Sequence, residues 1–242
     1  MLTHFKAVLF DFDDTLHDDT ASCRYAAERA AGDIAVVCGL DAYAIACAYE
    51  VEANAFWENL HAGDLAKGPV GLLQRFWGLA LRKMGIEDAA LAARAADAFN
   101  RYCMESVGLF PGALELLTSL RERGAALGLV TNGFVETHRE KIEFLRLNEM
   151  FHVIAIADEV GMVKPDPRIF SHVCERLGAL PSASVMIGDH FERDILGARA
   201  AGMQTVWINA RNEEIPAGAE PPDAIAQDID ALVALLNTAA RT

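Results

Sequence analysis

Short apolar runs that end abruptly at a polar residue recur along the chain. Five of them stand at residues 7–10, 127–130, 153–157, 185–187 and 205–208. The polar positions that follow are Asp11, Thr131, Asp158, Gly188-Asp189 and Asn209. Runs that are apolar at every position are typical of parallel strands buried on both faces. Helical segments separate these runs, so the pattern predicts an α/β fold with a doubly wound parallel sheet.

The helical segments between the later strands have recognisable ends. Residues 112–123 predict a helix that stops at Gly124, and residues 134–147 carry apolar side chains near helical spacing. Asp166-Pro167 is typical of an N-cap followed by proline in the first turn, and it opens a helix predicted to run to Gly178. A loop rich in Pro, Gly and Glu at 211–222 precedes a last helix predicted over about 224–236.

One interval breaks this alternation. More than a hundred residues separate the first two strands, whereas the later strands start roughly 20 to 30 residues apart. Residues 18–106 are rich in Ala, Leu, Glu and Arg at helical spacing, with interruptions near Gly63 and residues 68–71. We expect them to form an inserted α-helical cap of four or five helices. Residues 1–17 and 107–242 would then form the core.

Composition narrows the kind of partner. The chain carries 21 basic and 35 acidic residues, a net charge of −14, which argues against binding a nucleic-acid polymer. Five cysteines without a Cys-x-x-Cys pair are typical of reduced thiols in the cytoplasm. The first apolar run is too short for a signal peptide, and no stretch of about 18 apolar residues predicts a membrane span. We therefore expect a cytoplasmic protein that does not bind membranes; the sequence does not indicate its oligomeric state.

Polar signatures follow four of the predicted strands, at the edge where open α/β sheets bind ligands. Asp11 and Asp13 stand one residue apart at the first strand end, so they can serve one site in different roles. Thr131-Asn132-Gly133 offers a hydroxyl and a glycine before a helix, whose N-terminal amides favour an anion.

The other two signatures supply a cation and more carboxylates. Lys164 is followed by Pro165, which favours an extended approach to the site. Asp189 follows a strand, and Asp194 stands five residues further on at the start of a helix. Magnesium takes oxygen ligands and keeps several waters, so a few such carboxylates suffice to hold it. Each signature alone is weak, because strand ends and helix caps often carry such residues; the ordered set of four is the specific signal.

The set resembles the haloacid dehalogenase-like (HAD) superfamily, whose members carry Asp-x-Asp-x-Thr, then Ser/Thr, then Lys, then an acidic pair. Here the matches are Asp11/Asp13/Thr15, Thr131, Lys164 and Asp189/Asp194. The resemblance covers about residues 5–18 and 107–210, and the predicted insertion matches the family's cap in position only. The stretches 131–134, 159–165 and 194–198 are similar to the pyrimidine 5′-nucleotidase and N-acylneuraminate-9-phosphatase branch.

The resemblance implies a role for each matched residue. Asp11 would attack phosphorus and form an aspartyl-phosphate, and Asp13 would protonate the leaving alcohol and later activate water. Thr131, the amides near Asn132 and Gly133, and Lys164 would bind the phosphate oxygens. Mg²⁺ would be held by the metal set Asp11, Asp13 (through its backbone carbonyl), Asp189 and Asp194, with Asp194 acting directly, through water, or by orienting Lys164.

The implied function is a magnesium-dependent phosphatase acting on a small phosphorylated metabolite, with nucleoside 5′-monophosphates favoured over sugar or acyl-sugar phosphates. Cap aromatics are a possible stacking surface for a base, but their helical context also suits the cap's own core; they are Phe56, Trp57, Phe76 and Trp77. His17 and His190 flank the acidic loops, and we expect them to be peripheral to a metal that prefers oxygen.

Other functions stay open at this point. A dehalogenase shares the fold and the nucleophile, but it needs neither a metal nor a second acid, so Asp13 and the Asp189/Asp194 pair count against it. A phosphoryl-transfer mutase differs only in its product. In a receiver-like phospho-acceptor module the acidic pair precedes the phosphorylated Asp and no large cap occurs. A catalytically idle scaffold would not require the complete acid set.

Overall fold

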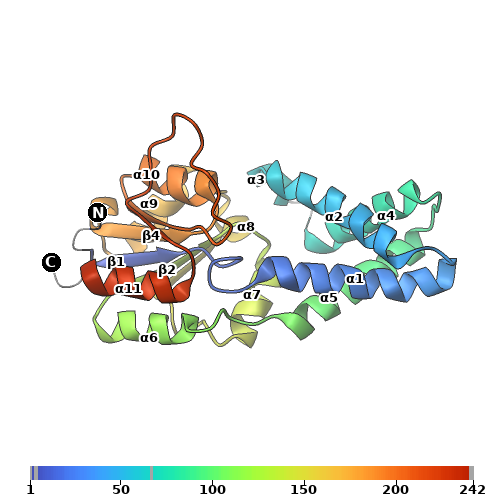
Figure 1. The fold of residues 1–242 in the computed structure, drawn as a ribbon, viewed down its shortest axis with the longest axis horizontal. Coiled ribbons are helices and arrows are strands. Elements are labelled where there is room, and N and C mark those ends of the chain that lie inside the picture. The colour runs from blue at the N-terminus through green and yellow to red at the C-terminus, as the bar shows by residue number, and fades with distance from the viewer. Residues whose placement is uncertain (1, 3–4, 66–67, 240–242) are drawn as a thin grey trace. The chain divides into compact units, whose positions relative to one another are not determined.

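The structure is a computed structural model that describes residues 2, 5–65 and 68–239. The chain divides into two compact units. The first is formed by Met1–Asp18 together with Leu109–Thr242, and the second by Asp19–Gly108. The first unit contains the sheet, and the second is helical (Figure 1).

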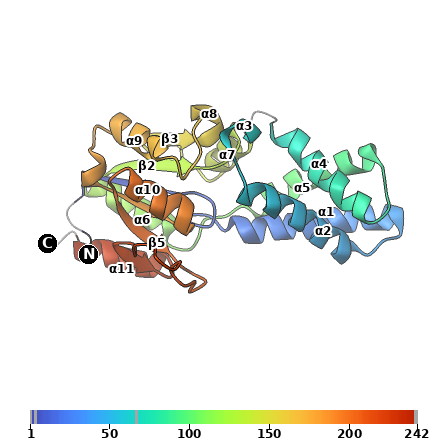
Figure 2. The same cartoon turned by 90° about the horizontal axis from the view of Figure 1, so that it is seen from above.

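The first unit is built on one six-stranded sheet in which every neighbouring pair of strands is parallel. The strand order is β3-β2-β1-β4-β5-β6, and Figure 2 shows β3 and β5 toward opposite edges. This is the order of a doubly wound sheet, and it confirms the predicted fold class. The strands are β1 (Ala7–Phe10), β2 (Ala126–Thr131), β3 (Val153–Ile156), β4 (Ser184–Gly188), β5 (Gln204–Ile208) and β6 (Ala224–Ala226).

Helices cover both faces of this sheet, and each face has its own apolar core. On one face α6 (Ala113–Glu122), α7 (Val135–Phe144) and α11 (Ile229–Ala239) pack against side chains such as Val8 and Phe10. On the other, α9 (Pro167–Arg176) and α10 (Gly197–Ala200) pack against side chains such as Leu9. Figure 1 shows α9 and α10 across the sheet from α6 and α11. Because alternate residues of β1 enter different cores, the strand is buried on both faces, as its unbroken apolar run predicts.

Short helical turns complete the first unit. They are α8 (Ala157–Val160), the 3₁₀ turn η1 (Pro181–Ala183) and the π-helical turn η2 (Phe191–Leu196), which leads into α10. The predicted N-cap of α9 is confirmed, because the Asp166 carboxylate accepts a hydrogen bond from the Arg168 N–H at 2.9 Å.

The end of the chain differs from the prediction. Residues 224–226 form the edge strand β6 beside β5, and the last helix begins at Ile229 rather than near Ala224. Asp228 marks the helix start, because its carboxylate accepts a hydrogen bond from the Ala231 N–H at 2.8 Å. A three-residue strand is too short to show an alternating pattern, so its alanines read as helical in the sequence.

The described residues of the second unit form five helices, where the sequence predicts four or five. They are α1 (Asp19–Cys38), α2 (Ala42–Glu58), α3 (Ala62–Leu65), α4 (Pro69–Lys83) and α5 (Ala89–Ser106). Their shared core includes a stacked aromatic pair, Tyr49 and Trp77, with ring centroids 4.2 Å apart. Trp77 and Phe76 are buried, as the cap-core interpretation expects, whereas Phe56 and Trp57 are only half-buried.

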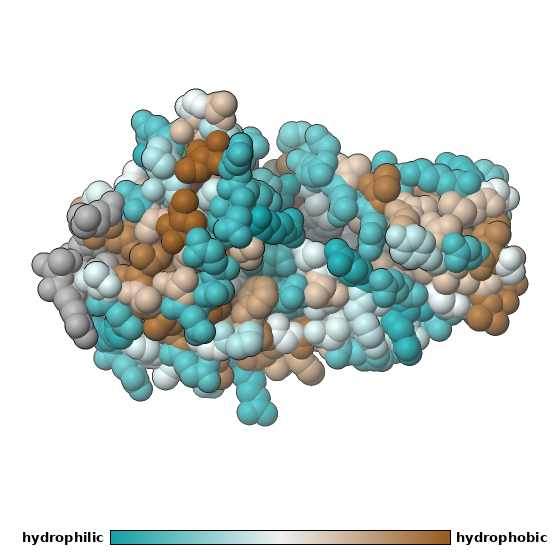
Figure 3. All heavy atoms as spheres, viewed as in Figure 1, coloured by the Kyte–Doolittle hydropathy of each residue, from teal (hydrophilic) through white to brown (hydrophobic). Residues whose placement is uncertain are grey.

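Hydrophilic and hydrophobic residues are interspersed over the face drawn in Figure 3. Among the described residues, none of the helices combines the length and the apolar character that crossing a membrane requires. All five cysteines carry free thiols.

Candidate active site

The strand order places three of the predicted site residues at one edge of the sheet. Asp11 directly follows β1, Thr131 ends β2, and Asp189 directly follows β4. Since β1 lies between β2 and β4 and all three run in parallel, their carboxyl ends meet there. From β1 the chain adds β2 and β3 on one side and then β4, β5 and β6 on the other, so the strand order reverses between β1 and β4. Doubly wound sheets bind ligands at such a switch point.

Lys164 reaches the same edge from the loop after α8. Its ammonium Nζ lies 2.7 Å from Asp11 Oδ1 and 2.6 Å from Asp194 Oδ1, and its side chain is only 2% exposed. Asn132 fixes the backbone of Lys164 on both sides: its Oδ1 accepts from the Lys164 N–H at 2.8 Å, and its Nδ2 donates to the Lys164 carbonyl at 3.0 Å. The Asn132 side chain therefore holds the lysine, and only its backbone stays a candidate for binding phosphate.

Asp194 is fully buried, and the chain makes room for it at Gly188. A Cβ on Gly188 would stand 2.4 Å from Asp194 Cγ, so a side chain at the end of β4 would displace this carboxylate. Asp194 Oδ2 also accepts the His190 N–H at 3.0 Å. Glycine at the strand end is thus required by the close approach of Asp194.

Three carboxylates lie together here, those of Asp11, Asp189 and Asp194, each with an oxygen within 4.8 Å of the others. Burial raises the pKa of Asp11 well above its ordinary value, and the charge of Asp194 raises it further. Burial and the charges of Asp194 and Asp14 raise the pKa of Asp189 to about 7. Burial alone would lower the pKa of Lys164, but the carboxylates of Asp11 and Asp194 raise it above its ordinary value. The cluster therefore holds more negative charge than one lysine offsets.

A divalent cation suits this imbalance. Magnesium is bound through carboxylate oxygens and stabilises their ionised forms, so it would lower the raised pKa values of Asp11 and Asp189. The donor set of three buried or nearly buried carboxylates with no nitrogen ligand among them fits a hard cation.

Thr131 presents a hydroxyl that the described residues leave without a hydrogen-bond partner, although Oγ1 is buried. A buried polar group without a partner costs about 1–3 kcal/mol, so a bound water, ion or substrate that accepts this hydrogen bond would be stabilised there. An anionic oxygen at the carboxyl edge of β2 would accept this hydrogen. The position agrees with the predicted phosphate-binding role.

Asp13 is not part of the three-carboxylate cluster through its side chain. Its Oδ2 lies 2.9 Å from His138 Nε2, and its Oδ1 lies 3.3 Å from Lys141 Nζ. His17 Nε2 lies 3.8 Å from the same Oδ1, so this buried histidine contacts the second acid rather than the carboxylate cluster. The sequence-based reasoning missed His138 and Lys141, whose signal is a basic pair spaced i, i+3 on the helix after Gly133.

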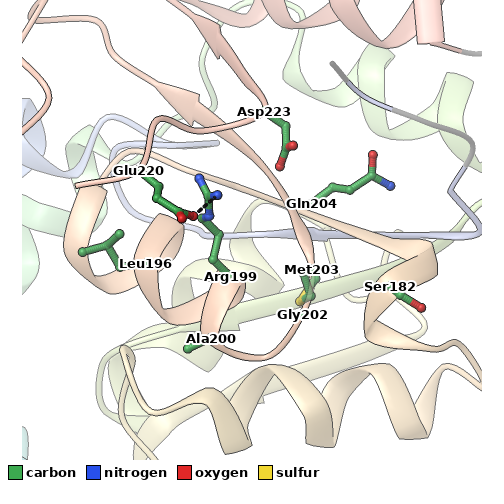
Figure 4. A pocket seen from close by; sticks show the side chains of 9 residues that line it. All are labelled: Ser182, Leu196, Arg199, Ala200, Gly202, Met203, Gln204, Glu220 and Asp223. Atoms are coloured by element: carbon green, nitrogen blue, oxygen red, sulfur yellow. Dashed lines mark hydrogen bonds and ion pairs between the residues drawn. The ribbon is translucent and has the colours of Figure 1, made fainter. Parts of the chain in front are cut away.

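A separate pocket lies at the opposite edge of the sheet (Figure 4). It has a volume of about 610 Å³ and is lined by residues around Gln204, where β5 begins. Its charged groups pair with the protein itself: Arg199 contacts Glu220 at 2.5 Å, and Asp223 accepts the Thr205 N–H at 2.9 Å. This pocket is therefore separate from the carboxyl edge, where the predicted chemistry lies.

A doubly wound sheet that carries a buried lysine and three carboxylates at its switch point defines an α/β enzyme equipped to bind a cation and an anionic substrate together. The family model of haloacid dehalogenase-like hydrolases matches residues 5–202. The chain belongs to this family of hydrolases, and within it is an enzyme of the phosphatase type.

Individual relatives support this assignment. Glyceraldehyde 3-phosphate phosphatase of Methanopyrus kandleri is 33% identical over 84% of this chain and 83% of its own. Pyrimidine 5′-nucleotidase YjjG of Escherichia coli is 37% identical over 52% of this chain and 56% of its own. The crystal structure of YfnB from Bacillus subtilis bound to magnesium superposes with a TM-score of 0.76 over 97% of this chain and 100% of that one, at 24% identity. The predicted resemblance to the HAD family and to its nucleotidases is confirmed.

Proposed function

We propose that this chain is a magnesium-dependent phosphomonoester hydrolase that works through an aspartyl-phosphate on Asp11. The observation that carries the proposal is the buried contact of Lys164 with both Asp11 and Asp194 at the carboxyl edge of the sheet. This contact brings the Asp11 carboxylate and the positive charge of Lys164 next to the three-carboxylate cluster, which is the candidate cation site. The unpartnered Thr131 hydroxyl on the neighbouring strand supports the same reading.

The reaction then has two steps on the same carboxylate. An oxygen of Asp11 attacks phosphorus, the ester P–O bond breaks, and the leaving alcohol takes a proton from Asp13. Asp13, now a carboxylate, removes a proton from water, which attacks the aspartyl-phosphate and releases inorganic phosphate. Lys164, Thr131 and the amides near Asn132 and Gly133 hold the phosphate oxygens as charge moves.

We propose that magnesium is held by Asp11, Asp189 and Asp194, with the Asp13 backbone carbonyl as a further ligand. When bound, the ion offsets the repulsion between the carboxylates and the phosphate and orients the group in transfer. The helical unit, predicted as residues 18–106, is proposed as the cap that determines which ester enters.

Hydrolysis of p-nitrophenyl phosphate is expected to require magnesium. Without the ion, the carboxylates of Asp11 and Asp189 repel the substrate, so excess chelator should lower activity to background. The measurement is initial rate in magnesium buffer, in excess chelator, and after magnesium is restored. Full activity in chelator would refute the metal requirement.

The same site predicts a pH-dependent effect on stability. The Asp189 pKa rises from its ordinary value of 3.8 to about 7 on folding, so the metal-free folded state binds an extra proton. The extra proton on Asp189 stabilises the folded state. This contribution to the free energy of unfolding is fully present below about pH 4 and is lost as pH rises through 7, so the Asp189 part of the stability falls across this window. Magnesium prefers the ionised carboxylate and should raise Tm more at pH 8 than at pH 5. An equal rise at both pH values, or an undiminished one in Asp189→Asn, would contradict the assigned ligand.

The finer proposal is a preference for nucleoside 5′-monophosphates. It is supported by 37% identity to a pyrimidine 5′-nucleotidase over 52% of the chain and by the half-buried rings of Phe56 and Trp57 in α2. An aromatic ring that stacks on a base contributes about 1–3 kcal/mol. The burial of Phe76 and Trp77 in the helical core removes two of the four candidate rings.

A triose phosphate is the competing substrate class, favoured by a relative whose name states glyceraldehyde 3-phosphate and that matches most of the chain. Comparison of kcat/KM for nucleotides, sugar phosphates and flavin mononucleotide decides between them. We expect nucleotides to lead and Trp57→Ala to lower their kcat/KM by about tenfold, within the stacking range above. A sugar phosphate that leads while nucleotides are inert would refute the preference and leave the phosphatase intact. Release of inorganic phosphate rather than an isomeric ester excludes a mutase.

A further inference from the structure

His138 connects two parts of the candidate site that the sequence treats separately. It lies on α7, five residues after Gly133, and its side chain is buried. Nδ1 lies 3.2 Å from the Phe134 carbonyl oxygen and 3.3 Å from the Thr137 hydroxyl oxygen. The ring is thereby fixed with Nε2 directed at Asp13, 2.9 Å from Oδ2.

Gly133 provides the space for this ring. A Cβ at position 133 would stand 1.9 Å from His138 Cε1 and 2.5 Å from both ring nitrogens. No side chain fits there unless the imidazole moves, because contacts below 3.0 Å do not occur between such atoms. The glycine that the sequence assigns to phosphate binding therefore also accommodates His138.

The second oxygen of Asp13 is held from the same helix. Lys141 stands one turn after His138, and its Nζ lies 3.3 Å from Asp13 Oδ1. Residues spaced i, i+3 share a helix face, so α7 presents both groups to one carboxylate. The Asp13 carboxylate is thus held at each oxygen by a side chain far away in sequence.

We propose that His138 is a positioning residue that holds the Asp13 carboxyl group in the orientation required for proton transfer, with Lys141 holding its second oxygen. The inference rests on the proposed function, in which Asp13 is the general acid and base. A proton donor acts only within hydrogen-bond reach of the leaving oxygen, and a misplacement of 1 Å can cost about 100-fold. An exposed loop carboxylate without such contacts would sample several rotamers.

The test compares His138→Ala and His138→Gln on two substrates of similar shape, p-nitrophenyl phosphate and phenyl phosphate. Phenolate is the poorer leaving group, so its departure depends more on a placed acid. We expect His138→Ala to lower kcat/KM for phenyl phosphate by about 10- to 100-fold and for p-nitrophenyl phosphate by less than about threefold. Glutamine keeps a polar amide near Asp13 and should restore most of the loss.

Controls separate positioning from a general loss of structure. Arg139→Ala alters the neighbouring position on α7, whose guanidinium pairs with Glu159 at the surface, and should leave both rates unchanged. Asp13→Asn, measured on the same two esters, gives the full leaving-group effect. If Asp13→Asn shows the leaving-group effect but His138→Ala lowers kcat/KM equally on the two esters, or not at all, the positioning role is overturned. Failure of Asp13→Asn to discriminate would refute the acid assignment and the positioning role together, and inactivity of the wild type toward both esters would refute the proposed phosphatase.

A second measurement tests the ring's location without relying on turnover. Gly133→Ala should lower Tm by several degrees in the wild-type background, since its Cβ collides with the imidazole. In the His138→Ala background the same change should cost little, because the colliding ring is gone. Additive effects of the two substitutions on Tm would show that the ring does not occupy this space, and would overturn the arrangement from which positioning is inferred.

Discussion

Asp11→Asn is expected to abolish phosphate-ester hydrolysis while the protein stays folded. The amide is neutral and a poor nucleophile, so the step that forms the aspartyl-phosphate is lost. The fold should survive, because Lys164 keeps its partner Asp194 at 2.6 Å and Asn matches Asp in size. The raised pKa of Asp11 shows that ionisation of this carboxyl is already opposed by burial, so a neutral amide is tolerated there.

The measurement is kcat on p-nitrophenyl phosphate, with Tm and intact mass recorded for the same sample. Asp158→Asn is a matched control, because it makes the same change at another carboxylate that follows a strand of the sheet. Asp158 lies two residues after β3, and its carboxylate accepts the Val135 N–H at 3.2 Å. It should retain most activity, because asparagine keeps a side-chain oxygen that can accept the Val135 N–H. Turnover that persists in Asp11→Asn with the amide intact would assign the nucleophile to another residue.

The positions of Asp11 and Asp189 at the carboxyl edge of the sheet were predictable, because a strand buried on both faces is an unbroken apolar run in the sequence. Asp11 and Asp189 end such runs, and the alternation of strands and helices requires their strands to be parallel. Once the sheet is parallel, polar residues that follow neighbouring strands must share an edge. The contact of Lys164 with Asp11 follows less directly, since a loop can take many paths; there the order of the four motifs was the signal.

The contacts around Asp13 were not predictable in the same way. His138 and Asp13 are 125 positions apart, and a polar pair on an amphipathic helix usually faces solvent. The burial of the His138 ring, its contact with Asp13 and the collision it would make with a Cβ at position 133 show that the ring is turned inward. The three-residue strand β6 was missed for a related reason, because pairing with β5 overrides the helical preference of its alanines.

Asn132 has a side-chain role that its place in the motif does not indicate. The resemblance implies that the amides near Asn132 and Gly133 bind phosphate, and the structure adds two hydrogen bonds between the Asn132 side chain and the backbone of Lys164. The residue type indicates which hydrogen bonds the Asn132 side chain can make. Its actual partner, Lys164, lies in a loop 32 positions away in the sequence. Supporting interactions of this kind locate the lysine and appear only in the three-dimensional structure.

Asp13→Asn is expected to separate the acid–base role from metal binding. The substitution keeps the backbone carbonyl, which is the proposed ligand, and the amide oxygen can still accept a hydrogen bond from Lys141. The proton donor is lost, and general acid–base catalysis contributes about 10²- to 10⁴-fold. We expect a loss of that size on alkyl phosphates and a smaller loss on p-nitrophenyl phosphate, whose leaving group departs without a proton. The magnesium-induced rise in Tm should be unchanged.

Asp14→Asn serves as the control for charge, because it removes one negative charge from the same loop. Asp14 has a φ of 57°, a left-handed conformation that asparagine tolerates, so the backbone should be preserved. We expect a loss of less than about tenfold that is the same for aryl and alkyl esters, well below the acid–base range. If Asp13→Asn behaved in that way instead, with equal losses on both classes of ester, Asp13 would act only through its charge, and the proton that the leaving alcohol needs would have to come from elsewhere in the site.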